Sequence, residues 1–337
     1  MKAKLNFKQI VSSLVILYFV ILSSVSAQTK ETSAPNDKDT IYLKVDKQLP
    51  IINGFRFIPT DVIRDPFIDT YIKLSAGTGA ALDLTSYVKN FQGEVFDTAS
   101  GDLTYVSGGL EFQYAVNDWL AFNIGGGGSS RLGNNAYTLL TSGISYTTGF
   151  TLGGKIKIWK DEKMLLSGSV DYTSQEIALY SIYDFVKDIY ENGGEIDSAK
   201  NSLLEKDKVY VAFLNANYAY APTNWCGFTA VGGWGISKAF QSKDRGNFRI
   251  GATYSIDFEN VEFIKFPIGL LLSTRYNSYA ETGSTLSDIF EYGFKIAYTG
   301  HKDFDIGIEG TYQSVKYALS AEPVKTVLTK FNLRYYF

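Results

Sequence analysis

The sequence predicts an all-β protein, a single antiparallel transmembrane β-barrel of about twelve strands. Three observations favour this fold. Apolar and polar side chains alternate with a period of two in many segments, the chain is rich in glycine and aromatic residues but poor in proline, and short connections alternate with longer ones. The wall of a membrane barrel, with one apolar and one polar face, has this pattern.

The composition narrows the fold class. The 337 residues include 31 Gly, 24 Tyr and 23 Phe against 7 Pro, and the mean hydropathy is −0.05. Outside the N-terminus, no apolar run approaches the roughly 20 residues that a helix needs to cross a bilayer. Abundant aromatic residues and glycine without apolar blocks are typical of strands that alternate between lipid and lumen. Composition alone leaves a soluble β-sandwich as the alternative.

Residues 1–27 predict a secretory signal peptide. Three lysines within the first eight residues precede an apolar run at residues 10–22, and Val-Ser-Ala at 25–27 provides a small-residue cleavage site. The run is short and ends in small polar residues, which disfavours an uncleaved membrane anchor. Without the three lysines the chain has 29 basic and 35 acidic residues, so its net charge is near −6 and a nucleic-acid partner is disfavoured.

Residues 28–68 separate this peptide from the barrel, which we predict at residues 69–337. Residues 28–40 are polar and lack periodicity, as in a flexible leader. Residues 41–68 mix apolar pairs with three prolines, which exclude a regular central strand or a long helix. Two interpretations stay open for them: an irregular ordered segment on the barrel rim or partly inside the lumen, and a linker.

Twelve alternating segments follow, separated by turn residues. In the second segment, for example, Val106, Leu110 and Phe112 share one face, while Ser107 and Glu111 lie on the other. The predicted strands cover residues 70–80, 103–116, 119–130, 143–159, 164–172, 208–220, 225–237, 247–258, 262–276, 288–298, 304–314 and 326–337.

The lengths of the connections alternate. Short turns follow the even-numbered segments, and longer connections follow the odd-numbered ones. Transmembrane barrels place short turns on one side of the membrane and long loops on the other, and an even strand number puts both ends of the wall on the short-turn side. A sandwich has no reason to sort its connections in this way, so the pattern favours the barrel.

The last segment, residues 326–337, resembles a known class of strand. Phe331, Leu333, Tyr335 and Phe337 fall on one face, polar residues fall on the other, and the chain stops on an aromatic residue. This strand resembles the C-terminal strand of bacterial outer-membrane β-barrel proteins. The resemblance implies a cell outer membrane location, contact with outer-membrane lipid and lipopolysaccharide, a periplasmic short-turn side, and recognition of these four residues by the barrel-assembly machinery.

One connection departs from the strand pattern. Residues 176–190 carry apolar side chains closer to a period of 3.6 than of 2, and Asn192, Gly193 and Gly194 follow as a helix stop. We therefore predict a helix in a long external loop. Its apolar face either binds a partner or packs over the end of the barrel.

The sequence predicts no catalytic residue, metal site or cofactor. His301 is the single histidine and Cys226 the single cysteine, and they are 75 positions apart, so no metal-ligand spacing occurs. His301 also falls in a predicted turn, where a histidine is usually solvated. Residues 125–128 are all glycine, but no Lys-Ser or Lys-Thr pair follows them, which excludes a phosphate loop. The chain is therefore not expected to be an enzyme.

Charged residues on the polar faces are the candidate lining of the lumen. Ionised groups inside a membrane-spanning barrel must be paired or hydrated. The set contains nine basic and six acidic residues. Either the charges neutralise one another in a filled barrel, or they line a narrow aqueous path with a mild preference for anions. The predicted set is Lys73, Glu111, Lys155, Lys157, Asp171, Arg249, Asp257, Lys265, Arg275, Glu291, Lys295, Asp305, Glu309, Lys330 and Arg334.

These features predict a channel-like outer-membrane barrel for the passive passage of small polar or ionic solutes. The alternative is a non-conducting structural or adhesive barrel that binds a partner through its external loops. The two differ in a bilayer, where only a channel produces ion-selective conductance steps. The sequence leaves the oligomeric state open.

Overall fold

The computed structural model describes residues 49–89, 94–133, 144–180, 189–190, 204–238, 245–279, 286–317 and 323–337. Every described residue belongs to one compact unit, residues 47–337. The predicted signal peptide and the leader at residues 28–40 lie outside the described residues. In the described part of the chain, no helix is long and apolar enough to cross a membrane.

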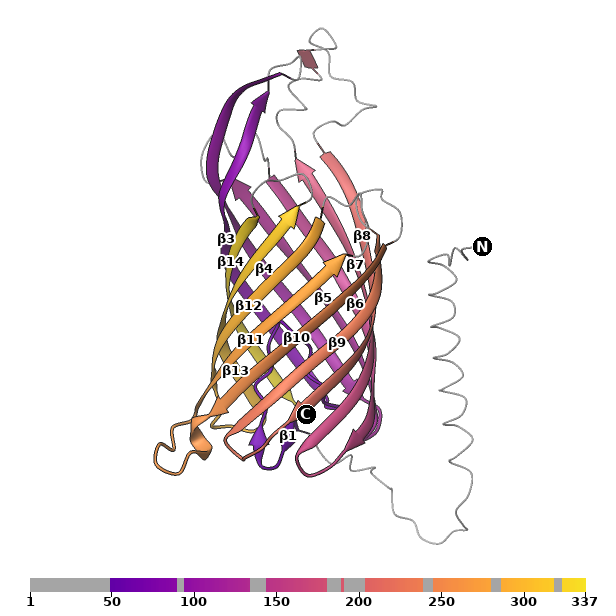
Figure 1. The fold of residues 1–337 in the computed structure, drawn as a ribbon, viewed down its shortest axis with the longest axis vertical. Coiled ribbons are helices and arrows are strands. Elements are labelled where there is room, and N and C mark those ends of the chain that lie inside the picture. Colours follow the sequence, from indigo (N-terminus) through magenta and orange to yellow (C-terminus); the bar gives the residue numbers. More distant parts are fainter. Residues whose placement is uncertain are drawn as a thin grey trace, which may run out of the picture. The chain divides into compact units, whose positions relative to one another are not determined.

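Twelve antiparallel strands close into one barrel (Figure 1). Each strand pairs with its neighbours in sequence, and the last strand returns to pair with the first, with Tyr336 opposite Tyr71. The predicted single antiparallel barrel of twelve strands is therefore confirmed. The strands of the wall are β3 (Tyr71–Lys89), β4 (Val95–Ala115), β5 (Leu120–Gly133), β6 (Ile144–Lys160), β7 (Met164–Tyr180), β8 (Leu204–Tyr220), β9 (Cys226–Lys238), β10 (Arg245–Asp257), β11 (Ile268–Tyr279), β12 (Leu286–Tyr298), β13 (Phe304–Tyr317) and β14 (Val324–Tyr336).

The outer face of the wall is apolar and exposed. Along β9, the outward Phe228 and Trp234 are 43% and 57% exposed, whereas the inward Thr229 and Val231 are buried. A water-soluble monomer rarely exposes so continuous an apolar surface, so this face is suited to lipid. Exposed apolar side chains on other strands include Leu74, Phe112, Ile124, Phe150, Leu214, Ile250, Leu272, Phe294, Ile308 and Phe331.

Five short connections lie at one end of the barrel, which we call the short-turn rim. Side chains shape these turns: Asn117 Oδ1, for example, accepts a hydrogen bond from the Leu120 N–H at 2.8 Å. Both ends of the wall lie at the same rim, where the Phe337 N–H donates to the Thr70 carbonyl at 3.1 Å. The five connections are residues 116–119, 161–163, 221–225, 258–267 and 299–303.

At the opposite end, two strand pairs extend further than their alternation predicts. β3 and β4 stay paired as far as Lys89 opposite Val95, so the long connection predicted after residue 80 is mostly strand. β7 and β8 stay paired as far as Tyr180 opposite Leu204. An antiparallel ladder needs backbone partners but not a two-faced sequence, so alternation underestimates these strands. Most residues of the connections at this end lie outside the described ranges.

The helix predicted at residues 176–190 is wrong in its first third. Residues 176–180 continue β7 and pair with both β6 and β8, whose backbone groups outweigh a weak helical period. Residues 181–188 lie outside the described residues. Ile189 and Tyr190 are the two described residues with α-helical backbone, so the described chain does not support a loop helix.

The ninth predicted strand begins six residues too early. β11 starts at Ile268, and residues 258–267 form a turn that contains the 3-10 helix η1 (Phe258–Asn260). Pro267 has no N–H for the ladder, and Lys265 has a φ of 45°, so an extended strand does not run through this stretch. Lys265 is exposed in the turn, which corrects its assignment to the lumen.

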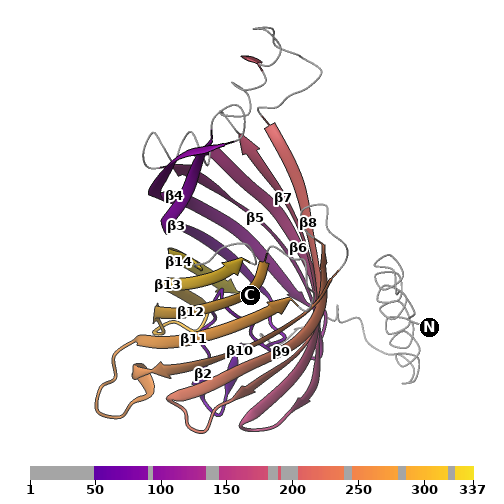
Figure 2. The same ribbon diagram turned by 45° about the horizontal axis from the view of Figure 1, so that its top comes forward.

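The segment before the wall lies inside the barrel outline in two views (Figures 1 and 2). It begins with a hairpin of β1 (Ile51–Ile52) and β2 (Phe55–Arg56), whose turn residues Asn53 and Gly54 have φ of 50° and 75°. Asn-Gly is a preferred pair for such a two-residue turn. The chain then runs irregularly to Thr70. We call residues 49–70 the plug, and most of its residues are buried. Residues 41–48 of the predicted segment lie outside the described residues.

Closure of the ladder predicts heat-modifiable migration. A barrel without free strand edges resists unzipping, so unboiled protein should migrate faster than boiled protein on a dodecyl sulfate gel. The measurement is the band shift between the two samples. Equal migration would contradict the seam between β14 and β3.

Candidate functional site

The plug is attached to the short-turn rim through backbone carbonyls. Asn53 Nδ2 donates to the Ala221 carbonyl at 3.1 Å. The Arg56 guanidinium donates to the carbonyls of His301 and Phe304. The hairpin at the start of the plug therefore bridges two different turns of the rim.

Glycines in the wall make room for apolar side chains of the plug. A Cβ at Gly251 would lie 2.6 Å from Ile63, and one at Gly293 would lie 2.8 Å from Val62, both closer than packed side chains approach. The four glycines of this kind lie on the consecutive strands β9 to β12, so the inner wall is complementary in shape to the plug. The facing pairs are Gly227 with Phe55, Gly251 with Ile63, Gly269 with Ile58 and Gly293 with Val62.

Asp61 joins the plug to two lysines of the wall. Its carboxylate pairs with Lys73 on β3 and, at 3.1 Å, with Lys330 on β14. Its N–H donates to the Glu309 carboxylate at 3.1 Å, and the Thr60 hydroxyl donates to the same group. Burial opposes ionisation of Asp61, but the two ammonium groups outweigh burial and hold its pKa well below the ordinary value.

Asp65 connects the plug to two basic residues of the wall in the same way. It pairs with Lys155 on β6 at 3.2 Å and with Arg334 on β14 at 2.7 Å. Lys155 also donates to the Phe67 carbonyl at 2.8 Å, and the Arg334 guanidinium lies 4.0 Å from the centre of the Tyr71 ring. Burial opposes ionisation of Asp65 as well, yet its two cationic partners keep its pKa well below the ordinary value.

Arg64 is a basic residue of the plug and pairs with acidic residues of the wall. It pairs with Asp171 on β7 and, at 3.3 Å, with Glu111 on β4, and it donates to Asn123 Oδ1 at 3.0 Å. Arg249 on β10 binds the other oxygen of Asp171 at 2.8 Å. The plug therefore takes part in a charge network that reaches several strands of the wall.

Asp69 differs from the other acidic residues of the plug. Burial, together with the nearby charge of Asp65, raises the pKa of Asp69 to about 8, so this carboxyl is mostly protonated at pH 7. Gln113 Nε2 donates to its Oδ1 at 2.6 Å and to its carbonyl at 2.9 Å. Asp69 thus adds polar contacts without adding charge.

The structure brings most of the predicted lumen charges to the plug. The residues in direct contact with it are Lys73, Glu111, Lys155, Asp171, Lys295, Glu309, Lys330 and Arg334.

The remaining predicted charges lie elsewhere. Arg249 and Asp305 pair with members of that group, and Arg275 and Glu291 pair with each other on β11 and β12. Lys157 pairs with Asp118 at the short-turn rim, where Asp257 accepts from Thr299.

Sequence reasoning missed the charges of the plug itself. Asp61, Arg64 and Asp65 stand within five positions, between Pro59 and Pro66, in an otherwise apolar stretch. Charged side chains in a buried segment need partners of opposite charge. The close spacing of these three charges in an apolar segment was therefore the signal that could have predicted ion pairs with the wall.

The predicted assembly residues lie on the outer face of β14. Phe331 and Phe337 are 50% and 54% exposed, and Leu333 and Tyr335 are half-buried. The Tyr335 ring packs against Phe337 and Phe304, with ring centres 4.8 and 4.9 Å apart. The aromatic end of β14 therefore forms a small exposed cluster.

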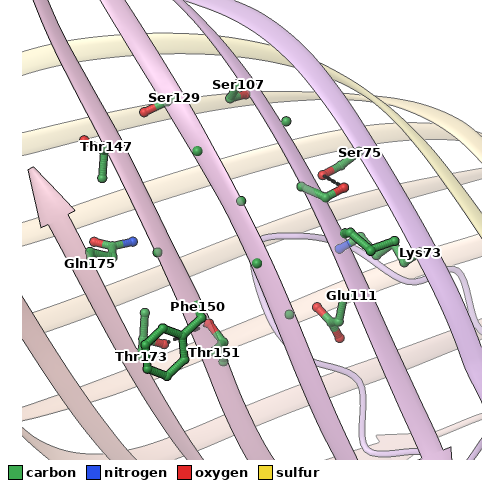
Figure 3. A pocket seen from close by; sticks show the side chains of 18 of the residues that line it. Lys73, Ser75, Ser107, Glu111, Ser129, Thr147, Phe150, Thr151, Thr173 and Gln175 are labelled. Atoms are coloured by element: carbon green, nitrogen blue, oxygen red, sulfur yellow. Dashed lines mark hydrogen bonds between the residues drawn. The ribbon is translucent and has the colours of Figure 1, made fainter.

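A cavity of about 310 Å³ with both polar and apolar lining borders the inner wall of β3 to β7 (Figure 3). Hydroxyl side chains such as Ser75, Ser129 and Thr147 line it, together with bare glycine backbone. Lys73 and Glu111, which bind the plug, belong to the same lining. The part of the lumen next to the plug thus carries charged and hydroxyl side chains and has space for water or a small polar solute.

The residues considered for chemistry do not assemble into a site. Among the described residues, no group of three or more His, Cys, Asp or Glu side chains is placed to hold a metal. His301 lies in a turn of the rim, where its Nδ1 accepts from the Asp303 N–H at 3.2 Å. Cys226 is buried at the start of β9.

Substitution of Gly227 by alanine is expected to displace the hairpin of the plug. The new Cβ would lie 2.8 Å from the Phe57 ring and closer still to that of Phe55. Overpacking of this kind costs about 1–3 kcal/mol, measurable as a lower free energy of unfolding in urea. Gly232→Ala on the same strand is the matched control, because its Cβ meets nothing within 4 Å. Equal stability of the two variants would show that the plug does not occupy this position.

Comparison with known proteins found similar solved structures at low sequence identity. No protein-family model matches the chain, and no curated protein matches it. The translocator domain of the autotransporter NalP from Neisseria meningitidis is 12% identical, with 81% of this chain and 90% of that chain covered and a TM-score of 0.45.

Two further solved structures are similar. An outer-membrane channel from Pseudomonas putida F1 is 13% identical, with 84% and 100% covered and a TM-score of 0.48. A FadL homologue from Pseudomonas aeruginosa is 10% identical, with 85% and 96% covered and a TM-score of 0.41. The solved structures that resemble this chain are thus bacterial outer-membrane β-barrels, the broad class that its C-terminal strand resembles.

Proposed function

We propose that the protein is an outer-membrane channel for small polar or ionic solutes, and that the plug closes its periplasmic half. The short-turn rim faces the periplasm, and the extended strand pairs β3–β4 and β7–β8 face outward. The apolar outer face supports a membrane location in contact with lipid and lipopolysaccharide. The charged and hydroxyl-lined lumen supports aqueous passage.

The observation that carries this proposal is that the wall is complete without the plug. All twelve wall strands have two neighbours in the ladder, and the hairpin of the plug pairs only with itself. Side-chain contacts and hydrogen bonds hold the plug. Its partners on the wall are charged and polar groups that water can solvate, together with apolar side chains such as Leu165, Val231 and Leu271. When the plug moves, a closed wall remains around a polar lumen, which is the architecture of a channel.

Uptake into liposomes tests the proposal. Liposomes that contain the mature chain are expected to admit small sugars and salts slowly, and liposomes that contain a chain without residues 50–68 are expected to admit them much faster. The difference arises because passage through the mature chain requires movement of the plug. Mature-chain liposomes as tight as protein-free ones, beside leaky plug-free ones, would contradict the channel function.

A permanently closed structural barrel is the second candidate function. The glycines on β9 to β12 favour it, because shape complementarity stabilises the plugged state. This candidate predicts no uptake through the mature chain at any solute concentration. The liposome experiment therefore separates the two functions.

We propose that the terminal aromatic residue serves assembly by the barrel-assembly machinery. Phe337 is 54% exposed, so the finished barrel gains from its burial less than the roughly 2 kcal/mol of a fully buried Phe. Deletion of Phe337 is expected to lower the outer-membrane level several-fold in cells and to leave refolding in detergent near normal. Equal losses in cells and in detergent would instead assign Phe337 to stability.

A further inference from the structure

The turn at residues 258–267 exposes three large apolar side chains. Phe263 is 89% exposed, Ile264 46% and Phe266 55%. The other turns of the short-turn rim have three to five residues, whereas this turn has ten. Its extra length therefore serves to present apolar side chains rather than to connect β10 with β11.

Hydrogen bonds hold this turn in one shape. The Ile264 N–H donates to the Val261 carbonyl at 3.0 Å, and the Phe266 N–H donates to the Phe258 carbonyl at 3.3 Å. At the start of the turn, Asp257 accepts from the Glu259 N–H at 3.1 Å. An ordered turn with an apolar tip is unfavourable in water, so the tip requires a covering surface.

The apolar side chains of the turn directly precede β11, whose outward side chains face the lipid. Outward positions of this strand fall on every second residue, at Leu272, Leu270 and Ile268, and the exposed Phe266 directly precedes the bend at Pro267 through which the chain enters the strand. Ile268 lies opposite Tyr298 in the ladder, and Tyr298 is itself 42% exposed on the outer face. Aromatic residues typically mark the level at which a barrel leaves the hydrocarbon region. Phe266 and the tip beyond it therefore lie at the membrane interface.

The direction in which the turn extends indicates which surface covers its apolar side chains. In Figures 1 and 2 the turn between β10 and β11 reaches sideways beyond the outline of the wall, to the left in both views. A turn that extends in this direction lies beside the bilayer and not below the lumen. Glu262 precedes Phe263, and Lys265 lies between Ile264 and Phe266, so charged side chains accompany the apolar ones, as in interfacial anchors at the level of the headgroups.

We propose that residues 261–266 form a lipid anchor, in which Phe263, Ile264 and Phe266 insert into the interface of the adjacent leaflet. The occupant of this apolar surface is phospholipid. The anchor holds the base of β10 and β11 at a defined depth in the bilayer.

Collision measurements on spin labels test this inference. A label at Phe263→Cys, in a Cys226→Ser background and in phosphatidylcholine vesicles, is expected to collide more with oxygen than with a water-soluble nickel complex. A label at Glu162→Cys, in the exposed turn at residues 161–163, is the matched control and is expected to show the reverse. The band shift between unboiled and boiled samples shows that both labelled chains are folded.

Two outcomes would overturn the anchor. Nickel accessibility at residue 263 equal to that at residue 162 would place the tip in water. Dipolar broadening between labels at residue 263 of different molecules, removed by dilution with unlabelled protein, would make the surface an interface between copies of this chain. Oxygen-dominated collisions without broadening support insertion into lipid.

Discussion

Deletion of residues 50–68 is expected to convert a closed barrel into a pore with a preference for anions. The wall ladder closes without the plug, so the deletion empties the lumen and leaves the strands paired. Water then solvates the charges that the plug now covers, as in open channels. Seven basic and five acidic residues of the predicted lining remain on the emptied inner wall, so cations are repelled more than anions. They are Lys73, Lys155, Arg249, Arg275, Lys295, Lys330 and Arg334, with Glu111, Asp171, Glu291, Asp305 and Glu309.

Planar-bilayer recording under a salt gradient measures this result. Stable conductance steps and a reversal potential on the anion side are expected from the plug-free chain. Lys155→Gln with Arg334→Gln in the same chain should shift the reversal potential toward cations. Lys302→Gln, in an exposed turn of the rim, is the control and should shift it little. A plug-free chain that shows the heat-modifiable band but no conductance would contradict an open path through the lumen.

Asp65→Asn is expected to cause the largest loss of stability among single substitutions in the plug. Lys155 and Arg334 are 1% and 4% exposed, and both depend on Asp65 for compensation of their charge. Breaking a buried ion pair from one side typically costs about 3–5 kcal/mol, because a buried charge is left unpaired. The measurement is the free energy of unfolding in urea at pH 7.

The pH dependence of this loss follows from the pKa of Asp65. Its folded pKa is depressed, so its stabilisation is fully present above the ordinary carboxyl pKa of about 4 and is lost as the pH falls through the folded value. The difference between the native chain and Asp65→Asn should therefore be constant above about pH 5. It should shrink only in strong acid, where Asp65 itself becomes neutral.

A rim ion pair provides the control for Asp65. Asp118 pairs with Lys157 at 2.9 Å, but its side chain is 71% exposed, so Asp118→Asn should cost no more than about 1 kcal/mol. Methionine at both Lys155 and Arg334, combined with Asp65→Asn, should recover most of the stability, because no buried charge is then left unpaired. Similar losses for Asp65→Asn and Asp118→Asn would show that Asp65 is hydrated and does not hold the plug.

Alternation predicts the wall well where the two faces meet different surroundings. Residues 304–314 and 326–337 were predicted as strands, and the structure has Phe304–Tyr317 and Val324–Tyr336. Because one face of the wall meets lipid and the other meets the lumen, apolar and polar residues must alternate along each strand, and this alternation is visible in the sequence. Alternation fails where that requirement ends, as in residues 176–180, which pair with neighbouring strands although their apolar period is closer to that of a helix.

The sequence by itself determined the closed all-β wall, the number and order of its strands, and the charged character of the lumen. Each of these properties follows from the local alternation of apolar and polar residues or from the composition. Only the tertiary structure decided which charges meet. Asp65 is separated by 90 residues from Lys155 and by 269 from Arg334, and the three come together because barrel closure places β6, β14 and the plug at one depth. Alternation assigns a face to each side chain but not a height along the barrel, and the height depends on the stagger of all twelve strands. The position of the plug was undetermined for the same reason, since its irregular backbone has no period and its place depends on glycines and charges distributed around the whole wall.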